Sequence, residues 1–254
     1  MSFEIATHLA LILVGVAFLA GFVDSIAGGG GLISVPALLL CGVTPLQALA
    51  TNKMQGMVGS GTAFANYVHT GQVHPSEGLL TAAISLAFGA LGSLVAAALP
   101  ADLLKLVMPP VLIGIAGFFA LKPGLTDLPR RARLTPLVFA LCVVPVIAGY
   151  DGFFGPGTGS FFMLAFVMLA GSGVLRATAQ TKMLNFASNI GSFAVFALSG
   201  HMLWMVGAGM ALGQLAGATL GARLAVRVGA RLIKPLLVAT STGMALRLAW
   251  QAWQ

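Results

Sequence analysis

The chain has 254 residues and a net charge of +7, yet only 7% of its residues are charged and 58% are hydrophobic. An ordinary soluble domain carries about 25% charged residues, so this composition, with a mean hydropathy of +0.99, excludes a soluble globular protein. Nucleic-acid binding is not expected either, because the Lys and Arg residues stand mostly at the ends of apolar segments, where they act as topology signals.

The apolar segments predict an all-α, polytopic membrane protein. Several contain 18 or more apolar residues, which is enough to cross a bilayer. Unpaired backbone amides are costly in hydrocarbon, and the alternation of a barrel strand is missing, so the spans are expected to be helices. Residues 1–9 contain Glu4 but no Lys or Arg; they lack the basic start of a cleaved signal peptide and are expected to stay in the mature protein.

In chain order, the apolar segments follow one plan twice. The first half has segments at 8–27, 32–43, 45–69, 78–98 and 102–121. The second half has segments at 135–154, 160–171, 174–199, 203–226 and 231–252. The most polar stretch lies between the halves and predicts a linker. The expected organisation is a first membrane repeat at 1–121, a cytoplasmic linker at 122–136 and a second membrane repeat at 137–254.

The two halves are copies of one unit. Shifted by 129 residues, the sequence matches itself at roughly 19 of the 64 positions in 42–105, and Lys53 falls on Lys182. The glycine-rich stretches upstream match at a shift of 127, where Asp24 falls on Asp151. A two-residue insertion or deletion therefore separates the two matching blocks.

Segment length and charge predict that the second repeat is inverted. A single helix over 8–43 would be about 54 Å long, against a hydrocarbon core of about 30 Å. The glycine run must therefore reverse the chain, either between two crossing arms or in a re-entrant hairpin, and each repeat makes an odd number of crossings. Both termini then lie outside, and by the positive-inside rule the basic side is cytoplasmic. That side holds Lys122, Arg130, Arg131, Arg133, Arg176, Arg223, Arg227, Arg231 and Lys234, and the other holds only Lys105 and Arg247.

Glycine-rich breaks interrupt the apolar sequence in both repeats: GFVDSIAGGGG at 21–31 and GYDGFFGPGTGS at 149–160. Each glycine weakens a helix by about 1 kcal/mol relative to Ala, and the next helix then begins with exposed amides that favour an anion. In transporters with inverted repeats, such broken helices form the substrate site. Close helix packing or a plain loop is the alternative. The candidate binding residues are Gly28, Gly29, Gly30, Gly31, Gly155, Gly157, Thr158 and Gly159.

A lysine follows each break, in ATNKM and in AQTKM. Lys53 lies about 12 Å inside its predicted helix, and Lys182 holds the same position in the other repeat. An ammonium at that depth needs a partner or water, which makes both lysines functional candidates. Together with Asn52 and Thr181 they predict an anion site. The alternative is that the lysines extend to the nearer membrane surface.

Asp24 and Asp151 are the only acidic residues well inside apolar sequence. They could carry a coupling proton. They could instead pair with the lysines or accept hydrogen bonds from the glycine-rich backbone, and the sequence leaves both interpretations open. Weaker candidates for lining the site are Gln55, Asn66, Asn185 and Asn189.

Other patterns predict packing or ordinary loop polarity. Gly213, Gly217 and Gly221 recur every four residues, which is typical of close helix packing. The group of His69, His74 and Glu77 lacks zinc-site spacing, and no set of catalytic residues stands out. No metal, no cofactor and no enzyme activity is therefore predicted.

The two motif pairs, GFVDSIAGGGG with ATNKM and DGFFGPGTGS with QTKM, resemble the TauE/SafE sulfite exporter family, also called the 4-toluene sulfonate uptake permease family. The resemblance covers nearly the whole chain. It implies movement of sulfite, sulfonates or related organosulfonates across the bacterial inner membrane, with the glycine breaks and both lysines at the substrate. The second break departs from the first by Pro156 and Thr158, so the half-sites need not be equivalent.

The expected function is a secondary transporter that exports a small sulfur-containing anion by alternating access. No nucleotide-binding motif is present, so coupling would come from an ion gradient, a partner or the gradient of the substrate itself. A passive anion channel and uptake of the same substrates are the alternatives. The expected partners are the anion and the lipid bilayer, and assembly as a homodimer stays open.

Overall fold

The computed structural model describes residues 7–100, 102–104, 106–108, 110, 111, 114 and 131–229. Every regular element in these ranges is helical, as predicted. The helices are α1 (Thr7–Ala27), α2 (Gly30–Leu40), α3 (Pro45–His69), η1 (Pro75–Gly78), α4 (Leu79–Ala98), α6 (Pro136–Val138), the π-helical η2 (Phe139–Val143), α7 (Val144–Phe153), α8 (Thr158–Met168), α9 (Val174–Leu198) and α10 (Trp204–Val228). The predicted segments 102–121 and 231–252, and the linker as far as residue 130, lie largely or wholly outside the described residues.

Helix length separates complete spans from half-length ones. Four helical stretches are long and apolar enough to cross a membrane: Leu9–Ala27, Pro75–Ala98, Pro136–Phe153 and Trp204–Val228. α2 and α8 have only 11 residues each, or about 16 Å, which is roughly half of a hydrocarbon core. α3 and α9 have 25 residues each, and both carry polar side chains that are buried.

The outer surface of the bundle is apolar and the interior contains charge. Leu106, Leu198 and Met205 are 73%, 91% and 87% exposed, whereas Lys53 and Lys182 are buried. Such an arrangement is the reverse of a soluble protein and suits a bilayer, where lipid covers apolar side chains and polar groups must find partners inside.

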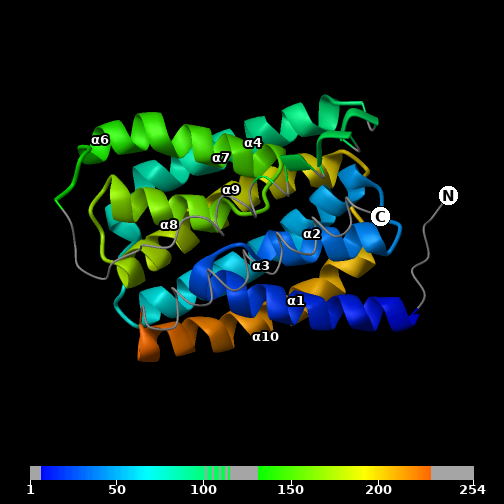
Figure 1. Cartoon of the computed structure of the whole chain (residues 1–254), viewed down its shortest axis with the longest axis horizontal. Helices are drawn as coiled ribbons and strands as arrows, with labels where there is room; N and C mark the ends of the chain where they lie inside the picture. Colours follow the sequence, from blue (N-terminus) through cyan, green and yellow to red (C-terminus); the bar gives the residue numbers. More distant parts are fainter. Residues whose placement is uncertain are drawn as a thin grey trace.

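Helices from the two sequence halves interleave. α1 packs along α10, α4 packs along α7 and α9, and α3 packs on both α9 and α10. Figure 1 shows the α1–α10 pair along one side of the molecule and α4 with α6 and α7 along the opposite side, with α3 and α9 between them. By the 127- and 129-residue shifts, α7 corresponds to α1 and α10 to α4. The α1–α10 contact therefore has its counterpart in the α7–α4 contact, and each joins a helix of one half to a helix of the other.

The two central helices run antiparallel. A Cβ on Gly56 of α3 would lie 3.4 Å from Asn189 of α9, and the ring of Phe64, further along α3, lies 6.5 Å from that of Phe186, which is earlier in α9. Residue numbers therefore rise along one helix as they fall along the other.

The glycine stripe of α10 is a packing face, as predicted, and the structure shows that its partner is α1. A Cβ on Gly213 would meet the carbonyl oxygen of Val14, and one on Gly217 would meet that of Phe18. Without side chains at these positions the two backbones approach closely, as small residues permit in membrane helices.

Candidate functional site

The first glycine break joins α1 to α2 through two residues. α1 ends at Ala27 and α2 begins at Gly30. Gly28 and Gly29 have φ values of 78° and 91°, in the left-handed region where a residue with a Cβ is strained by about 1–2 kcal/mol. The chain turns at these two residues, and the first amides of α2 have no helical partner behind them.

The second break joins α7 to α8 through four residues. α7 ends at Phe153 and α8 begins at Thr158, with Gly155 and Gly157 at φ values of 89° and 86°. The Tyr150 hydroxyl donates a hydrogen bond to the carbonyl oxygen of Pro156 (2.6 Å) and so fixes the longer turn. The N-cap glycines Gly29 and Gly157 differ by 128 residues, so the longer break accounts for one residue of the change in the shift, and the other is added after α8.

The two breaks touch each other. A Cβ on Gly28 would lie 2.5 Å from the backbone of Gly159, and one on Gly31 would lie 3.2 Å from Pro156. The Ser160 hydroxyl of α8 donates to the carbonyl oxygen of Ala27 at the end of α1 (3.1 Å). The N-termini of α2 and α8 therefore meet inside the bundle.

Lys53 of α3 pairs with Asp151 of α7. Its Nζ lies 2.9 Å from Asp151 Oδ1 and also donates to the main-chain carbonyl oxygen of Asp151. The Ser188 hydroxyl of α9 donates to the other carboxylate oxygen, Oδ2. The side chains of Lys53 and Asp151 are only 1% and 5% exposed. This pair joins the two halves of the sequence in the interior.

Lys182 of α9 pairs with Asp24 of α1. Its Nζ lies 2.8 Å from Asp24 Oδ2, and Asp24 Oδ1 accepts a hydrogen bond from the Gly30 amide of α2 (3.1 Å). The lysine side chain is 0% exposed and the aspartate 20%. Each lysine thus pairs with the aspartate of the other repeat, so pairing with the lysines, one of the two interpretations of the aspartates, is observed. Neither ammonium extends to the surface.

A small polar cavity of about 40 Å³ lies where the breaks and the pairs meet. It is large enough for one or a few water-sized groups. The residues that line it are Asp24, Gly29, Gly30, Gly31, Asn52, Gly56, Asp151, Gly155, Gly157, Thr158, Gly159, Asn185, Asn189 and Gln214.

Two asparagines give this cavity polar groups that can bind a ligand. Asn52 Oδ1 accepts from Ser34 (2.6 Å) and Gln55 (3.0 Å), which leaves its NH₂ group facing Gly31, 3.6 Å from the position of a Cβ there. Asn185 is 5% exposed, and its Oδ1 has no hydrogen-bond partner among the described residues. A buried polar atom without a partner marks a place where a further group is expected.

Most predicted site residues line this cavity, but the lysines do not. Gly28, Lys53, Thr181 and Lys182 are missing from its lining, and the two ammonium groups are paired with Asp151 and Asp24, which do line it. Thr181 is buried, and its hydroxyl has no partner in the described part of the chain.

Two lining residues were not predicted, Gly56 and Gln214. Gln214 follows Gly213 in α10, where a polar amide among small and apolar residues was an available signal. The signal for Gly56 was the repeat itself, because the 129-residue shift places it on Asn185, already a candidate.

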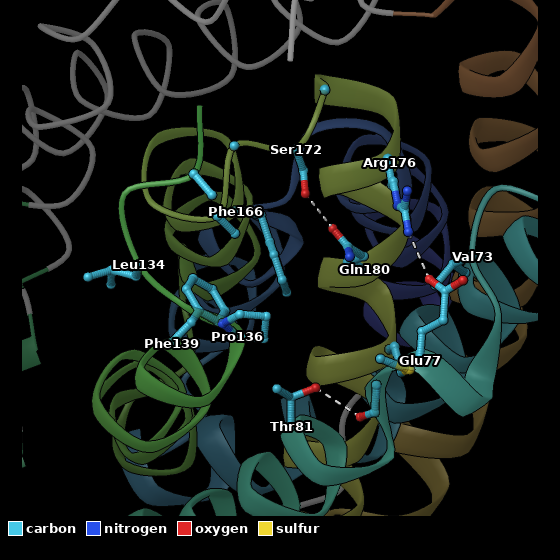
Figure 2. A pocket seen from close by; sticks show the side chains of 16 residues that line it. Val73, Glu77, Thr81, Leu134, Pro136, Phe139, Phe166, Ser172, Arg176 and Gln180 are labelled. Carbon is cyan, nitrogen blue, oxygen red and sulfur yellow. Dashed lines mark hydrogen bonds and ion pairs between the residues drawn. The ribbon is translucent and has the colours of Figure 1, made fainter. Parts of the chain in front are cut away.

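A second, larger cavity of about 480 Å³ lies between the starts of α4, α6 and α9. Figure 2 shows Arg176 and Glu77 facing each other on one side of it, with an Nη2–Oε2 distance of 2.8 Å, and Ser172 donating to Gln180 (2.9 Å). Both charged side chains of this pair are about half exposed. Gln180 precedes Lys182 by two positions on α9, so this cavity lies along the helix that carries one of the buried lysines.

No grouping of three or more His, Cys, Asp or Glu suitable for a metal occurs within the described ranges. What the small cavity offers is backbone amides, amide side chains and two balanced ion pairs. Such groups are suited to binding a small charged species, and none of them is arranged as a nucleophile with its base.

Comparison with known proteins shows relatives over the whole length of the chain. The family model described as "Sulfite exporter TauE/SafE" matches residues 13–248. A probable membrane transporter protein, ORF9, of Sinorhizobium sp is 54% identical over 245 residues, covering 96% of this chain and 94% of that protein. The probable membrane transporter protein YfcA of Escherichia coli K12 is 41% identical over 250 residues, covering 98% and 93%. A probable membrane transporter protein of Haemophilus influenzae is 40% identical over 251 residues, covering 98% of both chains. No solved structure matches.

Proposed function

Because the chain belongs to the TauE/SafE sulfite exporter family and is a membrane transporter, we propose that it exports a small sulfur-containing anion across the bacterial inner membrane by alternating access. The anion is sulfite, a sulfonate or a related organosulfonate. The observation that carries the proposal is the meeting of two helix N-termini at a polar cavity flanked by two buried lysines.

The groups around the cavity suit an oxyanion. Helix N-termini bind anions through their unpaired amides and their partial positive charge. The NH₂ group of Asn52 adds a donor whose orientation is set by the two hydrogen bonds to its oxygen. The lysines supply positive charge from behind the aspartates, and an anion reaches an ammonium only when one of the pairs opens.

Alternating access would come from rocking of two inverted repeats around this site. The antiparallel packing of α3 on α9 supports an inversion, since these helices hold equivalent positions in the two halves. The half-length α2 and α8, which begin at the breaks, support the proposal that the breaks are discontinuous or re-entrant. The small size of the cavity favours a carrier with an enclosed site over an open anion channel.

If a proton is coupled to transport, the two aspartates are the groups that would carry it. Their negative charges neutralise the two lysines, and protonating one of them would change the net charge of the site. Two ammonium groups and two carboxylates leave the site neutral, so a bound anion adds an uncompensated charge. Protonation of one aspartate would restore the balance. Asp24 faces Lys182, the Gly30 amide and, across the cavity, Asp151, and the Tyr67 hydroxyl donates nearby to Ser25. Export needs no obligatory proton, since the membrane potential already favours the exit of an anion.

Counterflow in proteoliposomes tests this function. Labelled sulfite, thiosulfate, taurine and sulfoacetate are each offered against unlabelled anion inside. We expect saturable counterflow for at least one of them, and its loss in Lys53→Ala and Lys182→Ala, with exposed His201→Ala as the control. Linear, unsaturable flux would make the protein a channel. Absence of flux for all four would overturn the substrate class.

A further inference from the structure

The carboxylate of Asp24 lies where an anion would bind. Its Oδ2 lies 2.8 Å from Lys182 Nζ, and its Oδ1 accepts a hydrogen bond from the Gly30 amide at the N-terminus of α2 (3.1 Å). An ammonium and a helix N-terminus are the two groups that a bound oxyanion would use. The side chain also lines the cavity and is 20% exposed, so the space beside it is open.

The carboxylate of Asp151 is held differently. Its donors are Lys53 Nζ and the Ser188 hydroxyl, and no backbone amide of α8 is among its hydrogen-bond donors in the described ranges. Lys53 also donates to the main-chain carbonyl oxygen of Asp151 and therefore stays bound to α7 through a group that cannot move away from the helix.

The difference follows from the sequence of the two copies. The counterpart of Ser188 in the first copy is Gly59, which has no hydroxyl to hold Asp24. The place that a larger side chain at Gly59 would fill is taken by Gln214, whose Nε2 donates to Gln55 (3.4 Å). Asp24 therefore depends on Lys182 and one amide, both of which an incoming anion can take over.

We propose that the transported anion binds in the place of the Asp24 carboxylate, on Lys182 Nζ and the Gly30 amide, while the Lys53–Asp151 pair stays closed. This inference rests on the proposed function and assigns its substrate position. Asp24 leaves Lys182 as the anion arrives and returns to it when the anion is released. Asn185, one turn after Lys182, also lines the cavity, and its NH₂ group, not its Oδ1, is the part of the side chain that can donate to the bound anion.

The test compares the two aspartates by direct binding to the purified, full-length protein. Asp24→Asn removes the competing carboxylate and keeps the shape of the side chain, so we expect labelled sulfite to bind at least tenfold more tightly than to the wild type. Asp151→Asn should give no such gain. The double variant Asp24→Asn/Lys182→Gln should lose it. Equal or weaker binding to Asp24→Asn, or an equal gain in Asp151→Asn, would overturn the inference.

A second measurement separates this inference from the choice of substrate. The melting temperature of each variant is recorded with sulfite, thiosulfate, nitrate and formate. If no sulfur anion binds any variant but nitrate or formate stabilises Asp24→Asn and not the double variant, the substrate class fails and the anion position stands. If no anion stabilises Asp24→Asn, the anion position is wrong.

Asp24→Ala prepared in formate replaces Asp24→Asn if the latter does not fold. Formate is the free form of the missing carboxylate and should occupy its place on Lys182. We expect formate to raise the melting temperature of Asp24→Ala by several degrees and to leave Asp151→Ala unchanged, because Lys53 stays bound to the main-chain carbonyl oxygen of residue 151. Failure of formate to stabilise Asp24→Ala would count against the proposal.

Discussion

The two lysine–aspartate pairs hold equivalent positions in the two repeats, but their surroundings differ. Asp151 also lines the small cavity, but its side chain and that of Lys53 are only 5% and 1% exposed, and Ser188 holds its second carboxylate oxygen. Around Lys182 and Asp24 the aspartate is 20% exposed, and its second oxygen binds a backbone amide. The two repeats thus contain equivalent lysine–aspartate pairs. Sequence differences such as Ser188 against Gly59 leave the Lys53–Asp151 pair held by more contacts and Asp24 more exposed.

Lys53→Ala should give the largest loss of stability. It leaves the carboxylate of Asp151 buried without its cation, which costs about 3–5 kcal/mol when one partner of a buried pair is removed. A thermal melt in detergent measures the loss. The double variant Lys53→Met/Asp151→Leu is the control and should recover most of it. If Lys53→Ala were as stable as the wild type, the Lys53–Asp151 pair would not be the more strongly held of the two pairs.

Gly28→Ala should follow, because it strains the break and also collides with the other break. Positive φ costs Ala about 1–2 kcal/mol, and the contact with Gly159 adds about 1–3 kcal/mol. Gly71→Ala is the matched control, since Gly71 has a φ of 69° and nothing within 4 Å of its Cβ position. Equal melting temperatures for the two variants would show that the breaks do not press on each other.

Ser188→Gly makes the second copy like the first at this position. It removes one donor from the Asp151 carboxylate, and leaving a buried acceptor unpaired costs about 1–3 kcal/mol. We also expect Asp151→Asn to begin tightening anion binding in this background, because Asp151 then resembles Asp24. Labelled-sulfite binding to the double variant checks this. An unchanged affinity would show that Ser188 is not the reason why Asp151 and Asp24 differ.

Arg176→Ala should have the smallest effect on stability. Its ion pair with Glu77 has the same 2.8 Å distance as the Lys182–Asp24 pair, but both side chains are about half exposed. Exposed pairs contribute about 0–1 kcal/mol, so the melting temperature should shift by no more than a degree or two. If Arg176→Ala lost as much stability as Lys53→Ala, burial would not explain why the two ion pairs are expected to differ.

The helices were predictable because each is marked by apolar length and by breaks. The predicted segments 45–69 and 174–199 differ from α3 and α9 by no more than one residue, since Thr44 with Gln47 caps the first and a glycine precedes the second. The change in the shift from 127 to 129 residues was also visible in the sequence, and one of these two residues lies in the longer second break.

The sequence predicted most of the residues that belong to the site, but not how they pair with one another. The repeat named the residues, but which aspartate pairs with which lysine depends on helices that pack across the two halves, and no local pattern encodes that. The sequence therefore left two interpretations of Asp24 and Asp151 open. Gln214 was missed because its side chain enters the site from a helix that periodicity assigns to packing.

The glycine stripe that joins α10 to α1 also bears on how the chain is made. Translation at about 5–20 residues per second delivers α10 roughly 10–40 s after α1, because nearly the whole chain lies between them. The backbone of α1 is thus covered only after α10 has been synthesised. A nascent chain cut before Trp204 would present that uncovered helix to lipid and to the quality-control proteases of the membrane.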